Sequence, residues 1–157
     1  MSEPLTIREQ AIQALEVKTN AQRGVDSYDE RDLPLTVLFE GADEPARIQY
    51  GFVETAMSVR LERMEAGQGA QVTDNGLETT GETDKRKWHT QANALLGDLI
   101  QSATGGDNTL GGLCQGIEYV SGGTAISPDG SNTVVAFADI RVRYRFLIGN
   151  PFSSEVE

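Results

Sequence analysis

The chain has 157 residues, and this length supports a single domain over residues 1–157. It contains 24 acidic residues and 13 lysine or arginine residues, which gives a formal net charge of −11. The acidic balance disfavours a dedicated nucleic-acid binder, because affinity for phosphates requires clustered lysine and arginine. No apolar run approaches the roughly 18 residues of a membrane span, so we expect no membrane partner. No secretory signal opens the chain, and the single Cys114 excludes an intramolecular disulfide. We therefore expect a cytoplasmic protein.

The first predicted element is a capped helix. Thr6 followed by Glu9 is a capping-box pattern, in which the threonine hydroxyl accepts a hydrogen bond from the backbone N–H of the glutamate. A helix is therefore predicted to begin near Ile7 and to end before Gly24. Its apolar residues recur at helical spacing, which predicts one stripe packed against the rest of the fold.

Two strands and a loop are predicted next. Dense apolar residues predict a buried strand at about residues 33–40, and the sequence GADEP at 41–45 is typical of a turn. The run at 47–67 is the longest alternating stretch, and it predicts one long strand with an apolar face and a largely polar face. Residues 67–84 hold several glycines and little to bury, so we expect a mobile, functional loop.

The remaining sequence predicts a helix and a terminal β-hairpin. Residues 85–106 return to helical spacing, with a broad apolar face on which we expect Trp88 to anchor the helix in the core. Two strands then flank a PDGS turn at 128–131, and residues 150–157 are expected to form a flexible tail. The whole order predicts an α+β fold, with about four mostly antiparallel strands and two helices on one face.

The sequence offers little that is typical of an enzyme. His89 is the only histidine, so a Ser-His-Asp triad would have to use it, and no multi-histidine metal site is available. We expect His89 to be a helix-surface or structural residue. Cys114 is expected to be a buried structural residue, and the glycine-rich residues 105–112 lack the ending of a phosphate-binding loop. We therefore expect no catalytic, metal or cofactor site.

Residues 138–146 alternate almost without a break, which places all their arginines on one face of a strand. Three of only 13 basic residues are collected in this arginine row: Arg141, Arg143 and Arg145. In one interpretation the row pairs across the sheet with carboxylates of the same chain, such as Glu54, Glu62 or Glu118. In the other, it faces an acidic surface of a neighbouring subunit, which would make a heterologous interface that closes a ring.

The order of these elements resembles the tail-terminator proteins of long-tailed bacteriophages, the lambda-type minor tail protein family. The resemblance covers roughly Thr6 to Ile148. It rests on the capped first helix, the DLPLTVLFEG strand, a long strand followed by a variable loop, the helix KWHTQANALLGDLI, and a closing strand pair that contains RVRYRF.

The resemblance implies a virion protein, assembled in the host cytoplasm, that forms a hexameric ring on the end of the tail tube. Such a ring stops tube polymerisation and presents a face to the head-completion or connector protein, while DNA passes through without specific binding. We expect the subunit or partner interface to include Arg141, Arg143, Arg145, Glu54, Glu62, Gln71, Asp74 and Leu77. The alternatives are another phage neck or head-completion adaptor, and a small enzyme of unknown chemistry.

Overall fold

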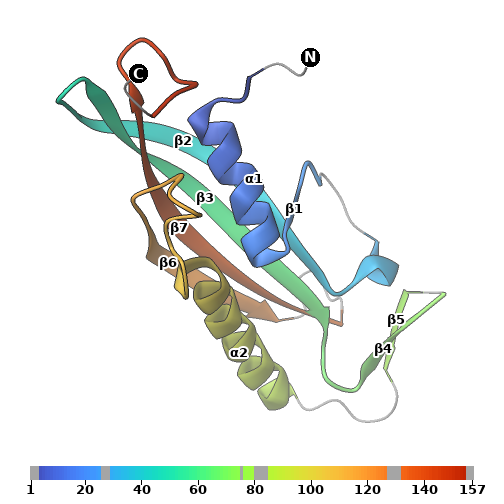
Figure 1. Cartoon of the computed structure of the whole chain (residues 1–157). Coiled ribbons are helices and arrows are strands. Elements are labelled where there is room, and N and C mark those ends of the chain that lie inside the picture. Colours follow the sequence, from blue (N-terminus) through green and yellow to red (C-terminus); the bar gives the residue numbers. More distant parts are fainter. Residues whose placement is uncertain (1–3, 26–28, 75, 80–84, 127–131, 155–157) are drawn as a thin grey trace.

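The computed structural model describes residues 4–25, 29–74, 76–79, 85–126 and 132–154 (Figure 1). It confirms the predicted α+β class. The elements in chain order are α1 (Ile7–Thr19), β1 (Gln22–Arg23), the 3₁₀ helix η1 (Glu30–Asp32), β2 (Leu35–Gln49), β3 (Phe52–Ala66), β4 (Ala70–Thr73), β5 (Gly76–Thr79), α2 (Lys85–Thr104), β6 (Gly116–Ile126) and β7 (Thr133–Leu147).

The main sheet has five strands in the order β1-β2-β3-β7-β6, and it is mixed. β1 runs parallel to β2, whereas all other neighbours are antiparallel. The four long strands agree with the prediction, but β1 was missed because its two residues are too short to carry a pattern. Both long helices lie on one side of the sheet, so the other side, which we call the open face, is covered by neither helix (Figure 1).

α1 begins and ends as its sequence predicts. The Thr6 hydroxyl accepts a hydrogen bond from the backbone N–H of Glu9 at 3.0 Å, and Asn20 closes the helix in the left-handed conformation at φ 54°. The helix buries its apolar stripe, which includes Ile7, Ala11, Ile12 and Leu15. Because burial of apolar surface contributes about 25 cal/mol per Å², this stripe fixes α1 to the sheet.

β2 is much longer than predicted. The strand expected at 33–40 continues through 41–45, where a turn was predicted, and ends only at Gln49. A register shift between Glu40 and Asp43 shows that a β-bulge absorbs the glycine there, and a second shift follows the proline. The turn prediction was therefore wrong, because glycine and proline are also accommodated at bulges and sheet edges.

The long strand predicted at 47–67 is divided by a two-residue turn. Tyr50 and Gly51 form this turn with φ values of 52° and 84°, which is the geometry of a tight hairpin. β3 keeps the predicted alternation, and the buried side chains on its helix-covered face are Thr55, Met57, Val59 and Leu61. β2 and β3 thus form a long hairpin rather than one continuous strand.

Trp88 anchors α2 in the core, as predicted. Its side chain is 1% exposed, and its indole N–H donates a hydrogen bond to the carbonyl of Gln68 at 2.7 Å. Gln91, one turn later, bonds the carbonyl of Ala66 and the N–H of Gln68, both at 2.9 Å. The start of α2 therefore holds the chain at the point where it leaves β3.

The segment predicted as a loop, 67–84, contains a second sheet, the hairpin of β4 and β5. This hairpin extends beyond the end of the main sheet (Figure 1). The loop prediction was wrong for these strands because short polar strands lack an apolar alternation. Residues 75 and 80–84 lie outside the described residues, and the mobility of the segment stays a prediction.

The predicted flexible tail, 150–157, begins with residues that are hydrogen-bonded to the fold. The carbonyl of Pro151 accepts from the N–H of Ile7 at 2.9 Å, and that of Ser153 accepts from Leu147 at 2.8 Å. Residues 155–157, like the turn predicted at 128–131, lie outside the described residues. Within the described ranges, no helix has the length and apolar character to cross a membrane.

Candidate functional site

The arginine row lies on the open face, as the alternation of β7 predicts. Ile140, Val142 and Tyr144 are buried on the helix-covered side, and the arginines between them point the other way. The charged strand residues that share the open face by register are Glu44, Arg47, Glu54, Arg60, Glu62, Glu118, Asp139, Arg141, Arg143 and Arg145. The fold therefore gathers basic and acidic groups from four strands on one surface.

Several of these groups pair within the chain. Arg143 forms an ion pair with Glu118 on β6. The guanidinium of Arg60 binds Asp139 on β7 through two hydrogen bonds, of 2.8 and 3.0 Å. These contacts are cross-strand pairs of the kind that stabilise a sheet modestly.

Among the described residues, neither Glu54 nor Glu62 forms an ion pair with the arginine row, although Glu54 lies directly opposite Arg145 on β7. Glu54 pairs instead with Arg47 on β2, at 2.6 Å, because β2 lies on its other side. Glu62 has no ion pair within the described part of the chain, and its register neighbour on β7 is Phe137 rather than an arginine. Of the three proposed partners, only Glu118 forms an ion pair with the row among the described residues.

Arg145 and Arg141 differ from Arg143 in their surroundings. The guanidinium of Arg145 lies 4.5 Å from the ring centre of Phe52, in a cation–π contact. Among the described residues, Arg141 has neither an ion pair nor a hydrogen bond from its side chain. Glu118 lies opposite Arg141 by register, but its carboxylate pairs with Arg143, so the guanidinium of Arg141 is available to a further carboxylate.

Arg141 lies between two hollows in the open face. One hollow of about 630 Å³ is lined by Arg141 and Arg143 together with Glu44 and Glu54. The other, of about 410 Å³, is lined by Arg141 together with Phe39 and other residues. The surface around the unpaired arginine is therefore concave on both sides.

The charges of the open face cancel, although the chain is strongly acidic. On this face the strands present five arginines and five carboxylates. The remaining 8 basic and 19 acidic residues therefore account for the whole net charge of −11. Against the rest of the molecule, the open face is the relatively basic side.

The structure does not bring Gln71, Asp74 and Leu77 to the arginine row. They belong to the β4–β5 hairpin, which follows the end of β3 where Ala66 pairs with Thr133 at the start of β7. The row pairs instead with the opposite half of β3. Asp74 is exposed at the hairpin turn, and the predicted interface residues thus form two separate groups.

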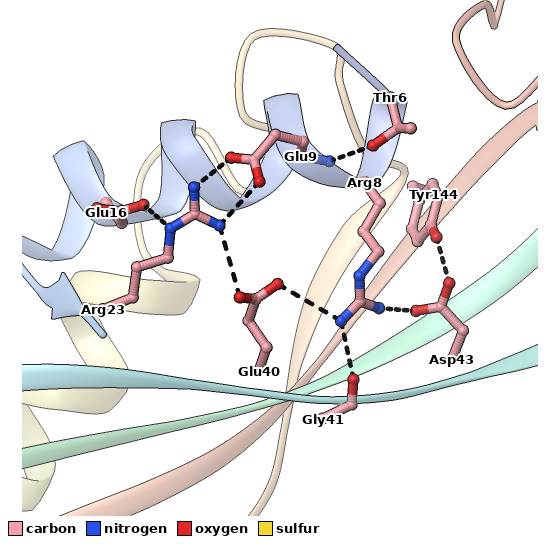
Figure 2. A network of polar contacts seen from close by, with 9 residues as sticks. All are labelled: Thr6, Arg8, Glu9, Glu16, Arg23, Glu40, Gly41, Asp43 and Tyr144. Atoms are coloured by element: carbon pink, nitrogen blue, oxygen red, sulfur yellow. Dashed lines mark hydrogen bonds and ion pairs between the residues drawn. The ribbon is translucent and has the colours of Figure 1, made fainter. Parts of the chain in front are cut away.

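A charged network between α1 and β2 was not predicted from the sequence (Figure 2). Arg23 binds Glu9 and Glu16 of α1, with Nη1 2.9 Å from Glu9 and Nε 2.9 Å from Glu16. It also approaches Glu40 of β2, at 3.5 Å. The periodicity of α1 places Glu16 on the solvent side of the helix. Its pairing with Arg23 depends on how the helix packs on the sheet, which the periodicity does not predict.

The second half of the network is centred on Asp43 (Figure 2). Its carboxylate accepts hydrogen bonds from Arg8 and from the hydroxyl of Tyr144, and Arg8 also donates to the carbonyl of Gly41 at 2.9 Å. Burial and the bond to Asp43 raise the pKa of Tyr144, which stays protonated as a donor. These contacts hold α1 against the bulge of β2, which is a structural role.

The network predicts a specific dependence of stability on pH. The hydrogen bond from Arg23 lowers the pKa of Glu9, so the ionised form is favoured in the folded state. The resulting stabilisation is present above the unfolded value of about 4.3 and is lost as pH falls through the folded pKa. Arg23→Gln is expected to remove about 1 kcal/mol or less at pH 7, and to flatten the decline of Tm between about pH 5 and 3.

The matched control is Arg31→Gln. Arg31 lowers the pKa of Asp29 to about 2, but the two residues are exposed neighbours in the sequence, so the pair can also form in the unfolded chain. The pH profile of this variant should follow that of the native chain. If the Tm of Arg23→Gln declined with falling pH as steeply as that of the native chain, the pair of Arg23 and Glu9 would have no role in stabilising the folded state.

The residues considered for catalysis have ordinary structural environments. Cys114 is buried, and burial raises the pKa of its thiol to about 11, which disfavours the reactive thiolate. His89 is exposed on α2. In the glycine-rich connector, Asp107 accepts hydrogen bonds from the N–H groups of Thr109 and Gly111, and so closes the loop on itself.

The described residues include no group of three or more histidine, cysteine and acidic side chains placed to hold a metal ion. No family model matches the chain, and no curated protein matches it. The open face, with its two hollows and the arginine row, is the surface on which the functional interpretation rests.

Proposed function

We propose that the chain is the tail-terminator subunit of a long-tailed bacteriophage. In this role it forms a hexameric ring on the last ring of the tail tube, stops tube polymerisation, and provides the attachment face for the head-completion or connector protein. DNA passes through the ring without specific binding. The assembled protein belongs to the virion, at the junction of tail and neck.

The observation that carries the proposal is the order of the elements. The sequence of α1, β2, β3, α2, β6 and β7 is the order on which the resemblance to tail terminators rests, and these elements build one sheet with its helices on a single side. The relatively basic open face supports the same role, because an acidic chain that assembles with itself needs one surface that attracts the others.

The experiment that tests the proposal has two readouts. The mass of the purified chain should correspond to a ring of about six subunits rather than to the 17.0 kDa single chain. Added to a polymerising tail-tube protein, the ring should then cap the tubes, so that their mean length falls as its concentration rises. A chain that stays monomeric and leaves tube length unchanged would favour a different neck or head-completion adaptor.

Replacing Arg141, Arg143 and Arg145 with serine is expected to weaken assembly while Tm stays nearly unchanged. The pair of Arg143 with Glu118 is 54% and 41% exposed, and such exposed pairs contribute about 0–1 kcal/mol to folding. Assembly should also become less sensitive to salt, because fewer charged contacts remain to be screened. Sedimentation velocity across salt concentrations, with Tm by circular dichroism, measures both effects.

Lys87→Ser is the matched control for this variant, because Lys87 is an exposed cation on α2, away from the open face. It should leave both assembly and Tm unchanged. Normal assembly of the triple variant beside a clear loss of Tm would instead favour the intramolecular interpretation of the arginine row.

A further inference from the structure

The available arginine and the densest group of exposed acidic residues lie in two different parts of the described molecule. The open face carries the unpaired Arg141, whereas η1 and the β4–β5 hairpin, which we call the acidic arm, lie at another end of the molecule. Residues 29–32 and 70–79 of the arm contain five acidic residues and one arginine. Asp29, Asp32 and Asp74 are exposed there.

The arm extends away from the core of its own chain (Figure 1). β4 and β5 pair with each other. Both strands contact η1, and β4 also contacts β3. An isolated two-stranded hairpin is marginally stable in water, so such an arm gains from contact with a further surface. Its position suits it to reach a neighbouring molecule.

The arm cannot neutralise the arginine row of its own chain. It leaves the sheet at Ala66, whereas Arg141 lies opposite Ser58, eight residues back along β3. At about 3.3 Å per residue this separation is roughly 26 Å, more than twice the Debye length of about 8–10 Å at physiological salt. The two charged regions can therefore meet only between different molecules.

We infer that the acidic arm of one subunit docks on the open face of the next, where its carboxylates meet Arg141 between the two hollows. The contact joins different surfaces of two identical chains, so it is heterologous and can close into a ring. Arginine suits this position, because its planar fork binds a carboxylate through two hydrogen bonds. The inference rests on the proposed ring and names the surfaces that build it.

The geometry of the open face agrees with an incoming chain rather than a small molecule. Its hollows, of about 630 and 410 Å³, lie on the two sides of one arginine and extend across several strands. Partly exposed aromatic rings accompany the charges, since Phe39 is 42% exposed and the Phe52 ring lies under Arg145. Aromatic and arginine side chains are typical of protein interfaces.

A reciprocal charge reversal tests the inference. Arg141→Glu and Asp74→Arg should each raise the concentration needed for half-assembly by about tenfold or more, because each places like charges face to face. The double variant restores an opposite pair and should return assembly to within about threefold of the native chain. Native mass spectrometry over a concentration series measures assembly, and circular dichroism checks that each variant is folded.

Lys87→Glu and Asp98→Arg are matched controls, because they make the same charge changes at exposed positions of α2. Both should assemble as the native chain does. A second measurement uses Arg141→Cys mixed with Asp74→Cys, in a Cys114→Ser background. Each subunit then has one thiol, so oxidation should give covalent dimers that contain one copy of each variant.

The outcomes separate the inference from the proposed function. A native chain that forms rings whose assembly is unaffected by either reversal would overturn the arm-to-face contact and leave the ring intact. Loss of assembly in both single variants without rescue in the double variant would also overturn the pairing. A native chain that is monomeric at all concentrations would overturn both the inference and the ring.

Discussion

Replacing Trp88 with alanine is expected to lower the free energy of unfolding by about 3–5 kcal/mol. The ring is 1% exposed, and its removal leaves a cavity at the point where α2 meets the end of β3. It also leaves the carbonyl of Gln68 without its donor. Against a typical total of about 5–15 kcal/mol, this loss is large. Urea unfolding followed by circular dichroism measures it.

The control for this variant is His89→Ala, at the exposed neighbouring position. It should change stability by no more than about 0.5 kcal/mol. Because Trp88 is the only tryptophan, the emission of the native chain reports on this site alone. A loss below about 1 kcal/mol in Trp88→Ala, or native emission like that of the unfolded chain, would contradict a buried anchor.

Gly67→Ala is expected to destabilise the fold by about 1–3 kcal/mol, through overpacking. A Cβ at this position would lie 2.3 Å from the Trp88 ring, far inside van der Waals contact, and the buried ring has little room to move. The two substitutions should therefore not be additive. In the Trp88→Ala background the added methyl group enters the cavity, and the cost should fall toward zero.

The control for Gly67 is Gly97→Ala on the exposed side of α2. No atom lies within 4 Å of a Cβ built there, so the substitution should stabilise the helix by up to about 1 kcal/mol. A double-mutant cycle by urea unfolding separates the two effects. Equal costs of Gly67→Ala with and without Trp88 would show that the ring is not what excludes the side chain.

The periodic parts of the chain could be predicted from sequence, whereas the irregular parts could not. The stripes of α1 and α2 and the alternation of β7 repeat over many residues, so local physics decides them. The Tyr50-Gly51 turn was missed because it interrupts the alternation with only two residues, and tyrosine is an unusual residue at positive φ. The extension of β2 was missed because glycine is typical of both β-bulges and turns, so Gly41 alone does not distinguish the two.

The candidate site shows the same division. The alternation of β7 places three arginines on one face, but it does not say which of them has a partner. Register puts Glu118 opposite Arg141, but the Glu118 side chain pairs with Arg143. It also puts Glu54 between Arg47 and Arg145, and the Glu54 side chain pairs with Arg47. The network around Arg23 and Asp43 depends in addition on how α1 lies over β2, and a single sequence carries no signal for that contact.

The position of β3 in the middle of the sheet also determines how the protein can fold. β3 joins β2 through a two-residue turn, but its partners on β7 lie from 67 residues away, for Ala66 with Thr133, to 95 residues away, for Phe52 with Leu147. Pairings of such long range form slowly, because the entropy of closing the chain opposes them before contacts can compensate. During synthesis the inner edge of β3 therefore stays unpaired until the C-terminal hairpin leaves the ribosome, and chaperone demand should be greatest in that interval.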